Sequence, residues 1–288
     1  MALAKLVIQK RKTQIKRICE LLRVSRSNQY QHPSQRPKRY TMKSDPEVLM
    51  SILKITKQRA TYGYKRSTAA INRTRRTEGL MTWGKSRILR VMQINRLILP
   101  KSGTRKERPH LGQVITLHSN VRWCSDIFEI KCWDGFKVWV AFVLDCCDRE
   151  AISFVAQSRP INHFDIIKLA DLAVTHRFGD LIQKLPTSTQ WLSDNGGQYT
   201  ADETREYLKD WGFEPKNTPA YSPESNGMAE AFVKLFKRDY VYTNELWTAE
   251  SVLRRLSEWF LDYNCNHPHS GLQMRSPLEY REANTVSV

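Results

Sequence analysis

The chain has 288 residues, of which 41% are hydrophobic and 26% are charged, so it is long enough for two domains with packed cores. Its longest uninterrupted apolar run, Val138 to Leu144, has seven residues, far fewer than the roughly 18 that a membrane-spanning helix needs. The N-terminal stretch lacks the apolar core and cleavage site of a secretory signal, and the six cysteines show no C-x-x-C spacing, so we expect reduced thiols in a cytoplasmic protein.

The net charge of +17 is distributed unevenly along the chain. Residues 1–118 hold 28 basic and 5 acidic side chains, whereas residues 119–288 hold 18 basic and 24 acidic ones. A basic segment of this size favours a polyanion as partner, most often nucleic acid. The alternative is a solvated basic surface without sequence preference, and the helical periodicity of the same segment argues against it.

The first part of the basic segment predicts short helices. Residues 14–24 place apolar side chains on one helical face, and a polar turn and a second short element follow. This pattern is typical of a helix-turn-helix, although it also fits a plain helical hairpin. We therefore expect a basic, helix-turn-helix-like segment over 1–44, which ends in a proline-containing linker over 31–44.

Three further basic helices are predicted within residues 45–100. The first begins at Asp45-Pro46-Glu47, where a capping aspartate, a proline and a first-turn glutamate agree, and it ends near Arg59. The second covers 65–76, and Thr82 is expected to cap the third. Such a compact trihelical unit with basic helices is predicted to bind DNA, and a linker over 101–118 follows it. Its candidate DNA contacts are Arg73, Arg75, Arg76, Lys85, Arg87 and Arg90.

Beyond residue 119 the apolar pattern changes from helical to alternating. Strands are predicted over 123–131, 136–144 and 151–156, and a D-G hairpin turn joins the first two. The other predicted elements are a helix over 161–178, a strand at Trp191-Leu192, a helix over 200–211, a strand over 214–218, and helices over about 224–243 and 248–265. These elements predict an α/β fold with a mixed five-stranded sheet flanked by helices.

Asp126 occupies an unusual position in this pattern. On an alternating strand it shares one face with the apolar residues Cys124, Phe128 and Ile130. An unpaired carboxylate among apolar neighbours would cost several kcal/mol. A partner arginine or lysine, a shifted pKa or a metal ion must therefore neutralise it, and a structural ion pair is the ordinary alternative to a functional role.

Two further carboxylates are candidates for either a functional or a structural role. Asp194 ends a buried strand and precedes a tight Asn-Gly-Gly turn, which in isolation is an ordinary Asx turn. Glu230 begins a polar helical stripe that continues with Lys234 and Lys237, and the ordinary alternative is an exposed Glu–Lys pair. Three carboxylates from a strand, a strand end and a nearby helix are the ligands that Mg²⁺ requires, and two such ions can serve phosphoryl transfer.

Three motifs containing these acids have a distinctive order and spacing. They are Trp123-Cys124-Ser125-Asp126, Leu192-Ser193-Asp194-Asn195-Gly196 and Ser222-Pro223-Glu224-Ser225-Asn226-Gly227-Met228-Ala229-Glu230. Between Asp194 and Glu230 lie 35 residues, and Lys237 follows seven positions after the glutamate. The set resembles DDE transposases with a retroviral-integrase-like catalytic core, and most closely bacterial insertion-sequence transposases of the OrfB type. Tyr62-Gly63-Tyr64-Lys65-Arg66 and the tail with His267-Pro268-His269 resemble that family too.

The resemblance implies an RNase H-like catalytic core over 119–245, followed by a C-terminal helix and tail over 246–288. It implies that Asp126, Asp194 and Glu230 hold two Mg²⁺ ions, for which Mn²⁺ can substitute. The reaction would be metal-dependent 3′-end cleavage and strand transfer of an insertion-sequence element, without a covalent protein–DNA intermediate. The resemblance adds Lys65, Arg66, Lys234, Lys237 and Arg238 to the candidate DNA contacts.

The family resemblance also implies partners and a location. The partners would be double-stranded DNA, both as terminal inverted repeats and as target, and an upstream-frame protein or a frameshift fusion with it. We expect a homo-oligomer on DNA, associated with the bacterial nucleoid in the cytoplasm and not with a membrane. Two other functions compete: a non-catalytic or decayed protein that binds transposon ends, and a structure-directed nuclease without preference for such ends.

Other polar residues of the core are interpreted as structural. Asp145 and Asp148 follow the second predicted strand, and Arg149 is expected to pair with one of them. The cluster of Cys265, His267 and His269 offers too few ligands for a zinc site and has no matching pair elsewhere, so we expect a packing role for it.

Overall fold

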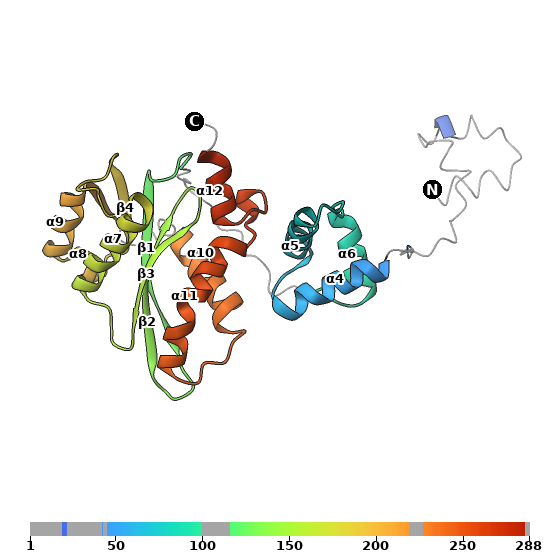
Figure 1. Ribbon diagram of the computed structural model, residues 1–288, viewed down its shortest axis with the longest axis horizontal. Coiled ribbons are helices and arrows are strands. Elements are labelled where there is room, and N and C mark those ends of the chain that lie inside the picture. Colours follow the sequence, from blue (N-terminus) through green and yellow to red (C-terminus); the bar gives the residue numbers. More distant parts are fainter. Residues whose placement is uncertain (1–18, 22–41, 43–44, 100–115, 219–226, 286–288) are drawn as a thin grey trace, which may run out of the picture. The chain divides into compact units, whose positions relative to one another are not determined.

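The computed structural model describes residues 19–21, 42, 45–99, 116–218 and 227–285 (Figure 1). The chain divides into two compact units, Met1–Pro46 and Glu47–Val288. Of the helix expected over 14–24, only residues 19–21 are described, and they are helical. The polar turn and most of the linker predicted after that helix lie outside the described residues.

The three basic helices predicted next are present. They are α4 (Asp45–Gln58), α5 (Tyr64–Thr77) and α6 (Lys85–Ile94). Their apolar faces meet in one cluster, in which Ile52, Ile88 and Met92 are fully buried. The expected cap at Thr82 is wrong, because α6 begins three residues later and its N-cap is Gly84. The reason lies in the neighbouring Trp83, whose backbone exchanges two hydrogen bonds of 2.8 Å with the Asn72 side chain, so this segment is fixed as an extended link.

The remainder of the described chain forms a five-stranded sheet with helices on both faces. Its strands are β1 (Arg122–Lys131), β2 (Lys137–Asp145), β3 (Ala151–Gln157), β4 (Thr189–Ser193) and β5 (Phe213–Asn217), in the order β3-β2-β1-β4-β5. The first three strands are antiparallel neighbours, and β4 and β5 add in parallel to β1. The predicted mixed sheet with an RNase H-like order is therefore confirmed.

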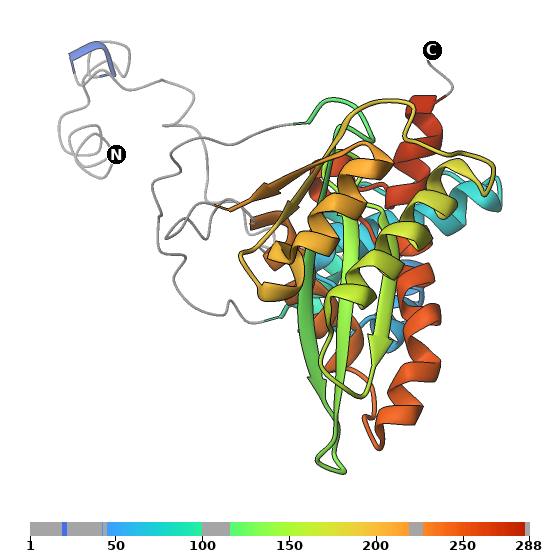
Figure 2. The same cartoon turned by 90° about the vertical axis from the view of Figure 1, so that its left-hand side faces the viewer.

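The long β1–β2 hairpin forms because the alternating strand β1 pairs with the continuously apolar strand β2 and a glycine closes their turn. Gly135 adopts φ 88°, a conformation that suits glycine in the D-G turn. Figure 2 shows β1 and β2 running side by side toward this hairpin. The predicted faces of β1 are confirmed, since Cys124, Phe128 and Ile130 pack in one cluster and Trp123 and Ile127 in the other.

Helices cover both faces of the sheet. On one face lie α7 (His163–Phe178), α8 (Gly197–Thr200) and α9 (Asp202–Trp211). On the other lie α10 (Gly227–Phe236), the π-helix η2 (Lys237–Val241) and α11 (Ala249–Asn266), and the short η3 (Ser270–Leu272) and α12 (Pro277–Thr285) follow. Figure 1 shows the sheet between these two groups of helices.

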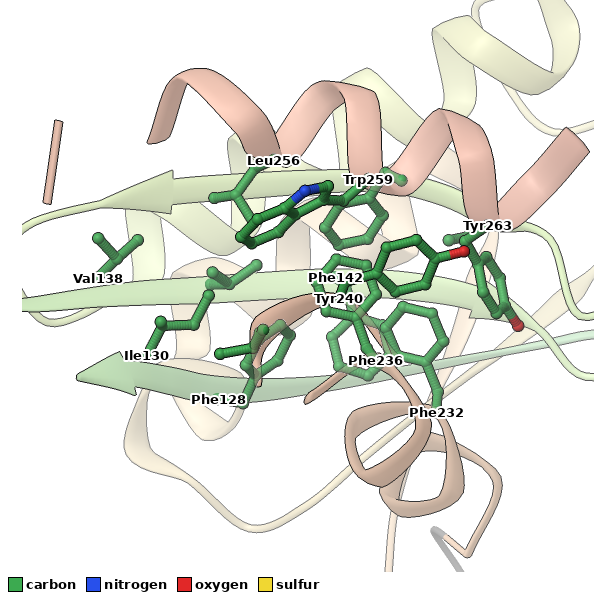
Figure 3. Packing of buried hydrophobic residues seen from close by; sticks show 14 of the residues in the cluster. Phe128, Ile130, Val138, Phe142, Phe232, Phe236, Tyr240, Leu256, Trp259 and Tyr263 are labelled. Carbon is green, nitrogen blue, oxygen red and sulfur yellow. The ribbon is translucent and has the colours of Figure 1, made fainter. Parts of the chain in front are cut away.

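The second face is packed mainly by aromatic rings. Phe142 of β2, Phe232 and Phe236 of α10, and Phe260 of α11 stack within 4.5–5.9 Å of one another, and Figure 3 shows this cluster between the sheet and the helices. Aromatic packing of this kind contributes both buried area and specific geometry. It fixes α10 against β1, which determines where the first turn of α10 lies.

Three details of the fold differ from the sequence-based expectation. The helix predicted over 200–211 is divided into α8 and α9, with Gly212 ending α9 in a left-handed conformation as expected. The helix predicted to about 243 continues from α10 as a π-helix rather than an α-helix. The C-terminal part forms α12 in addition to the predicted helix. None of the helices in the described parts of the chain is long and apolar enough to cross a membrane.

Candidate active site

Asp126 lies on β1, and Asp194 directly follows the neighbouring parallel strand β4. The register pairs Cys124 of β1 with Leu192 of β4, and each aspartate follows two residues later along its chain. Because side chains alternate along a strand, both aspartates belong to the sheet face that carries Cys124 and Leu192. That face is the one that α10 covers.

Glu230 reaches the same face from the helix. Ala229, Phe232 and Phe236 of α10 are buried against the sheet, and α10 packs on β1. Glu230 lies in the first turn of α10, next to this buried stripe, and its side chain is 41% exposed. Its carboxylate pairs with Lys234 one turn further along, at 3.2 Å between Oε2 and Nζ.

The pKa of Asp126 depends on the charges of the other two acids, Asp194 and Glu230. Burial, together with the negative charges of Asp194 and Glu230, raises the pKa of the Asp126 carboxyl from 3.8 to about 6. The backbone N–H of Ile127, which donates to Asp126 at 2.8 Å, and the positive charge of Lys237 act in the opposite direction. The fold thus brings Asp194 and Glu230 close enough to Asp126 for their negative charges to act on its carboxyl group.

The turn after β4 holds Asp194 in an ordered conformation. The N–H of Gly196 donates to Asp194 Oδ1 at 3.0 Å, as in an Asx turn. The side-chain amides of Asn195 and Asn217 donate to Thr218 O and Asp194 O, each at 2.9 Å, and so join the turn to β5. A Cβ on Gly196 would lie 3.0 Å from Asp194 Oδ1, so the glycine leaves room for the aspartate. The exposed Asp194 is therefore presented on a rigid support.

Lysine and arginine side chains border the acids. Lys237 Nζ lies 5.7 Å from the centroid of the Phe128 ring, which is two residues beyond Asp126 on the same face. The Lys234 side chain is 76% exposed, whereas Arg238 forms two hydrogen bonds with Asp239, the next residue. Lys237 is therefore the cation of this helix whose position relates most directly to Asp126.

The predicted DNA contacts of α5 and α6 fall into two groups. Lys65, Arg76 and Lys85 are exposed and form no ion pair with any residue that the structure describes. The second group makes contacts within the protein: Arg66 with Asp239 at 3.6 Å, Arg73 with Glu279 at 2.6 Å, Arg75 with Glu47 at 3.0 Å and with the Trp83 ring at 3.8 Å, and Arg87 with the same ring at 5.7 Å. Arg90 is half-buried.

The prediction that Arg149 neutralises Asp145 or Asp148 is wrong. The partner is Arg177 of α7, whose guanidinium lies 2.9–3.3 Å from carboxylate oxygens of Asp145, Asp148 and Glu150. Arg177 follows Ala170, Ala173 and Val174 at helical spacing, on the face of α7 that is buried. That spacing is the signal in the sequence that points to Arg177 as a buried partner.

The expected packing role of the histidines agrees with their surroundings. His267 and His269 are buried, and their rings contact each other and Tyr263. Within the described ranges, no three His, Cys, Asp or Glu side chains form a ready-made metal site. This holds for Asp126, Asp194 and Glu230 as well, since Glu230 pairs with Lys234.

Known proteins and families share most of this chain. Residues 117–223 and 192–277 match models of the integrase core domain. The chain is 40% identical over 238 residues to the transposase InsD for insertion element IS2A/D/F/H/I/K of Escherichia coli, a match that covers 82% of this chain and 78% of the relative.

Solved structures with a similar fold have lower identity. A simian T-cell lymphotropic virus intasome in complex with PP2A regulatory subunit B56 gamma is 16% identical, with a TM-score of 0.48 over 80% of this chain and 74% of that chain. The Mos1 transposase catalytic domain with raltegravir and Mg is 20% identical, with a TM-score of 0.43 over 57% of this chain and 76% of that chain.

Proposed function

The chain belongs to the insertion-element transposases with an integrase core domain, a class of polynucleotidyl transferases, and we propose that it cleaves the 3′ ends of its own element and joins them to another DNA strand. The observation that carries the proposal is the convergence of Asp126, Asp194 and Glu230 on one sheet face, where their charges act on one another. A structural role alone would pair such acids with cations, and Asp126 forms no ion pair with any described residue.

The three carboxylates fit a pair of divalent ions. The fit rests on their chemistry, since oxygen ligands with concentrated negative charge are what Mg²⁺ or Mn²⁺ requires. When bound, such ions lower the pKa of a water nucleophile and neutralise charge on the phosphate that reacts. Asp126 and Asp194 would contribute oxygens from a rigid strand and turn, and Glu230 would turn away from Lys234 to complete the site.

Other residues would hold the DNA strand in place. Lys237, whose charge acts on Asp126, would contact a phosphate of the reacting strand. Lys234 would break its ion pair with Glu230 and contact the DNA backbone instead. The exposed cations of the trihelical unit, Lys65, Arg76 and Lys85, would contact the terminal inverted repeats. We also propose that two copies act together on the two ends, and that an upstream-frame protein, separate or fused, assists them.

A cleavage assay with the whole chain tests this proposal. DNA that carries the element's end, labelled at its 5′ terminus, would be incubated with the protein and Mg²⁺ or Mn²⁺. We expect specific cleavage at the element's end, and a loss of about three orders of magnitude in Asp126→Asn, Asp194→Asn or Glu230→Gln, because each removes a ligand oxygen. Asp210→Asn, an exposed acid of α9, is the matched control and should retain full activity.

The assay also distinguishes the two competing functions. A protein that only binds transposon ends would retain the DNA without cleaving it, and the acidic variants would bind as the wild type does. A structure-directed nuclease would cleave unrelated DNA as readily as the element's end. Either result would refute the proposal.

A further inference from the structure

The link between α4 and α5, together with the first turn of α5, contacts the π-helix η2 at Asp239 and Tyr240. Thr61 Oγ1 donates a hydrogen bond of 2.6 Å to Asp239 Oδ1, and Arg66 lies 3.6 Å from the other oxygen of Asp239. The Arg59 guanidinium pairs with Asp262 of α11, and the other oxygen of Asp262 accepts from the Tyr240 hydroxyl at 2.8 Å. Residues 59–66, which we call the clamp segment, therefore contact η2 through two separate arms.

Burying the charged side chain of Asp239 costs free energy that its partners must offset. Its side chain is 2% exposed, and its carboxylate accepts hydrogen bonds from Thr61 and Arg238. Burial and the charges of nearby groups lower the pKa of the neighbouring His267 well below its ordinary value, so this imidazole is neutral and arginines supply the positive charge that Asp239 needs. A buried carboxylate costs free energy unless it is paired and hydrogen-bonded, so the docked clamp segment adds to the stabilisation that Arg238 gives Asp239.

The clamp segment is also anchored to the core beside Asp239. Tyr62 is buried, and its hydroxyl lies 3.1 Å from Nδ1 of His267, whose ring it meets edge-on. Arg66 also lies over the Tyr62 ring, at 5.8 Å from its centroid. These contacts use polar atoms of defined geometry, so the segment docks in one register rather than sliding along η2.

Because η2 is joined to α10 and begins with Lys237, docking of the clamp segment on η2 affects the candidate active site. The element continues directly from α10, which carries Glu230, and its first residue is Lys237. Lys237 acts electrostatically on Asp126 and lies two residues before Asp239. A π-helix is an energetically poor form of helix, seen mostly where tertiary contacts maintain it and often at functional sites. The contacts to Asp239 and Tyr240 are such tertiary contacts.

We propose that Asp239 is a positioning residue, through which the docked clamp segment of the DNA-binding helices sets the π-helical conformation that places Lys237 beside Asp126. Catalytic competence then depends on the contact of the clamp segment with Asp239 and not only on the affinity of the trihelical unit for DNA. The inference rests on the proposed function, since Lys237 is assigned there to the reacting strand.

The test compares two acid-to-amide substitutions, each of which weakens one contact of the trihelical unit to the rest of the chain. Asp239→Asn weakens the contact to η2, and Glu279→Gln weakens the Arg73 contact to α12, away from η2. Single-turnover cleavage of element-end DNA at saturating protein measures the chemical step, and titration of the same DNA measures the dissociation constant. Thr61→Val, which removes one hydroxyl and keeps every charge, is a milder variant should Asp239→Asn fold poorly.

We expect Asp239→Asn to slow cleavage by about 10- to 100-fold, because a misplaced positioning group costs rate in that range. Its dissociation constant for DNA should stay within about twofold of the wild type, and Thr61→Val should show a smaller effect of the same kind. Glu279→Gln should cleave within about threefold of the wild type. Hydrogen exchange of residues 237–241, measured without DNA, should be faster in Asp239→Asn and unchanged in Glu279→Gln.

Two results would overturn the inference. One is a cleavage rate of Asp239→Asn and Thr61→Val within about threefold of the wild type, with unchanged exchange over 237–241. The other is an equal loss in Glu279→Gln, which would mean that docking in general, and not Asp239, matters. A wild-type chain that binds the ends without cleaving them would refute the proposed function instead, and the exchange measurement would still decide whether the clamp segment controls η2.

Discussion

Arg177 of α7 donates a hydrogen bond of 2.9 Å from Nη2 to Asp148 Oδ2, in the turn between β2 and β3. The same guanidinium also reaches Asp145 and Glu150, and all four side chains are 0–2% exposed. Burial lowers the pKa of Arg177 and the three carboxylates raise it, with a net rise, so the arginine remains charged. This cluster ties α7 to the sheet at the end opposite the hairpin.

Replacing Arg177 should therefore be severely destabilising. Arg177→Met would leave buried carboxylates without their partner, which typically costs about 3–5 kcal/mol of unfolding free energy. Urea denaturation of the wild type and the variant measures the difference. Arg159→Met is the matched control, because Arg159 pairs with Asp165 but is 55% exposed, and we expect a cost below about 1 kcal/mol. Equal costs in the two variants would contradict this interpretation.

The sheet and the faces of its strands follow from local pattern. Alternation along β1 correctly placed Asp126 with Cys124 and Phe128, because the period of a strand is fixed by its backbone. Glycines at 135, 179 and 212 adopt positive φ and end the elements that were predicted to end there. Alternation and positive-φ glycines depend on neighbouring residues alone, so these features can be predicted from the sequence.

The features that escaped prediction depend on contacts between distant segments. Arg177 pairs with Asp145 because α7 packs back onto β2. The π-helix after α10 and its contacts to Thr61 join residues 178 positions apart. The electrostatic effect of Glu230 on Asp126 is long-range too, and only the resemblance of three motifs to a known family relates these two residues in the sequence.

Asp126 should make the metal-free protein less stable as the pH rises. Its pKa is raised from 3.8 to about 6 in the folded state, so between these values the folded chain binds more protons than the unfolded one. Stability is therefore lost as the pH rises from about 4 to about 6, and it stays constant above that range. Because the side chain is only partly buried, we expect a loss of about 1–2 kcal/mol.

The variant Asp126→Asn isolates this effect. In buffer with a chelator it should unfold at higher denaturant than the wild type at pH 7, and the two should converge near pH 4. Added Mg²⁺ should stabilise the wild type more than the variant, since ligands that bind only the folded state shift the equilibrium by mass action. A wild-type advantage at pH 7 without metal would show that Asp126 has a cationic partner after all.

We expect Lys234 to compete with divalent ions for Glu230. Removing its charge in Lys234→Ala should free the Glu230 carboxylate and lower the dissociation constant for Mn²⁺ about twofold, since an exposed pair of this kind is worth about 0.3–0.5 kcal/mol. Calorimetric titration without DNA measures the constant. Arg254→Ala breaks an exposed pair of the same i,i+4 spacing, with Glu250 on α11, and should leave Mn²⁺ binding unchanged. Weaker Mn²⁺ binding by Lys234→Ala would argue against Glu230 as a ligand.

Arginines of α5 should separate into DNA contacts and structural residues. Arg76 is exposed, so Arg76→Ala should weaken binding to element-end DNA and reduce the slope of log affinity against log salt by about 1, as one phosphate contact is lost. Arg73 donates two hydrogen bonds of 2.6 Å to Glu279, so Arg73→Ala should instead lower the free energy of unfolding, by about 1–3 kcal/mol. Its salt slope should match that of the wild type. Filter-binding titrations at several salt concentrations, with thermal melting of each variant, measure both effects. A reduced salt slope and unchanged stability in Arg73→Ala would show that Arg73 leaves Glu279 to bind a phosphate.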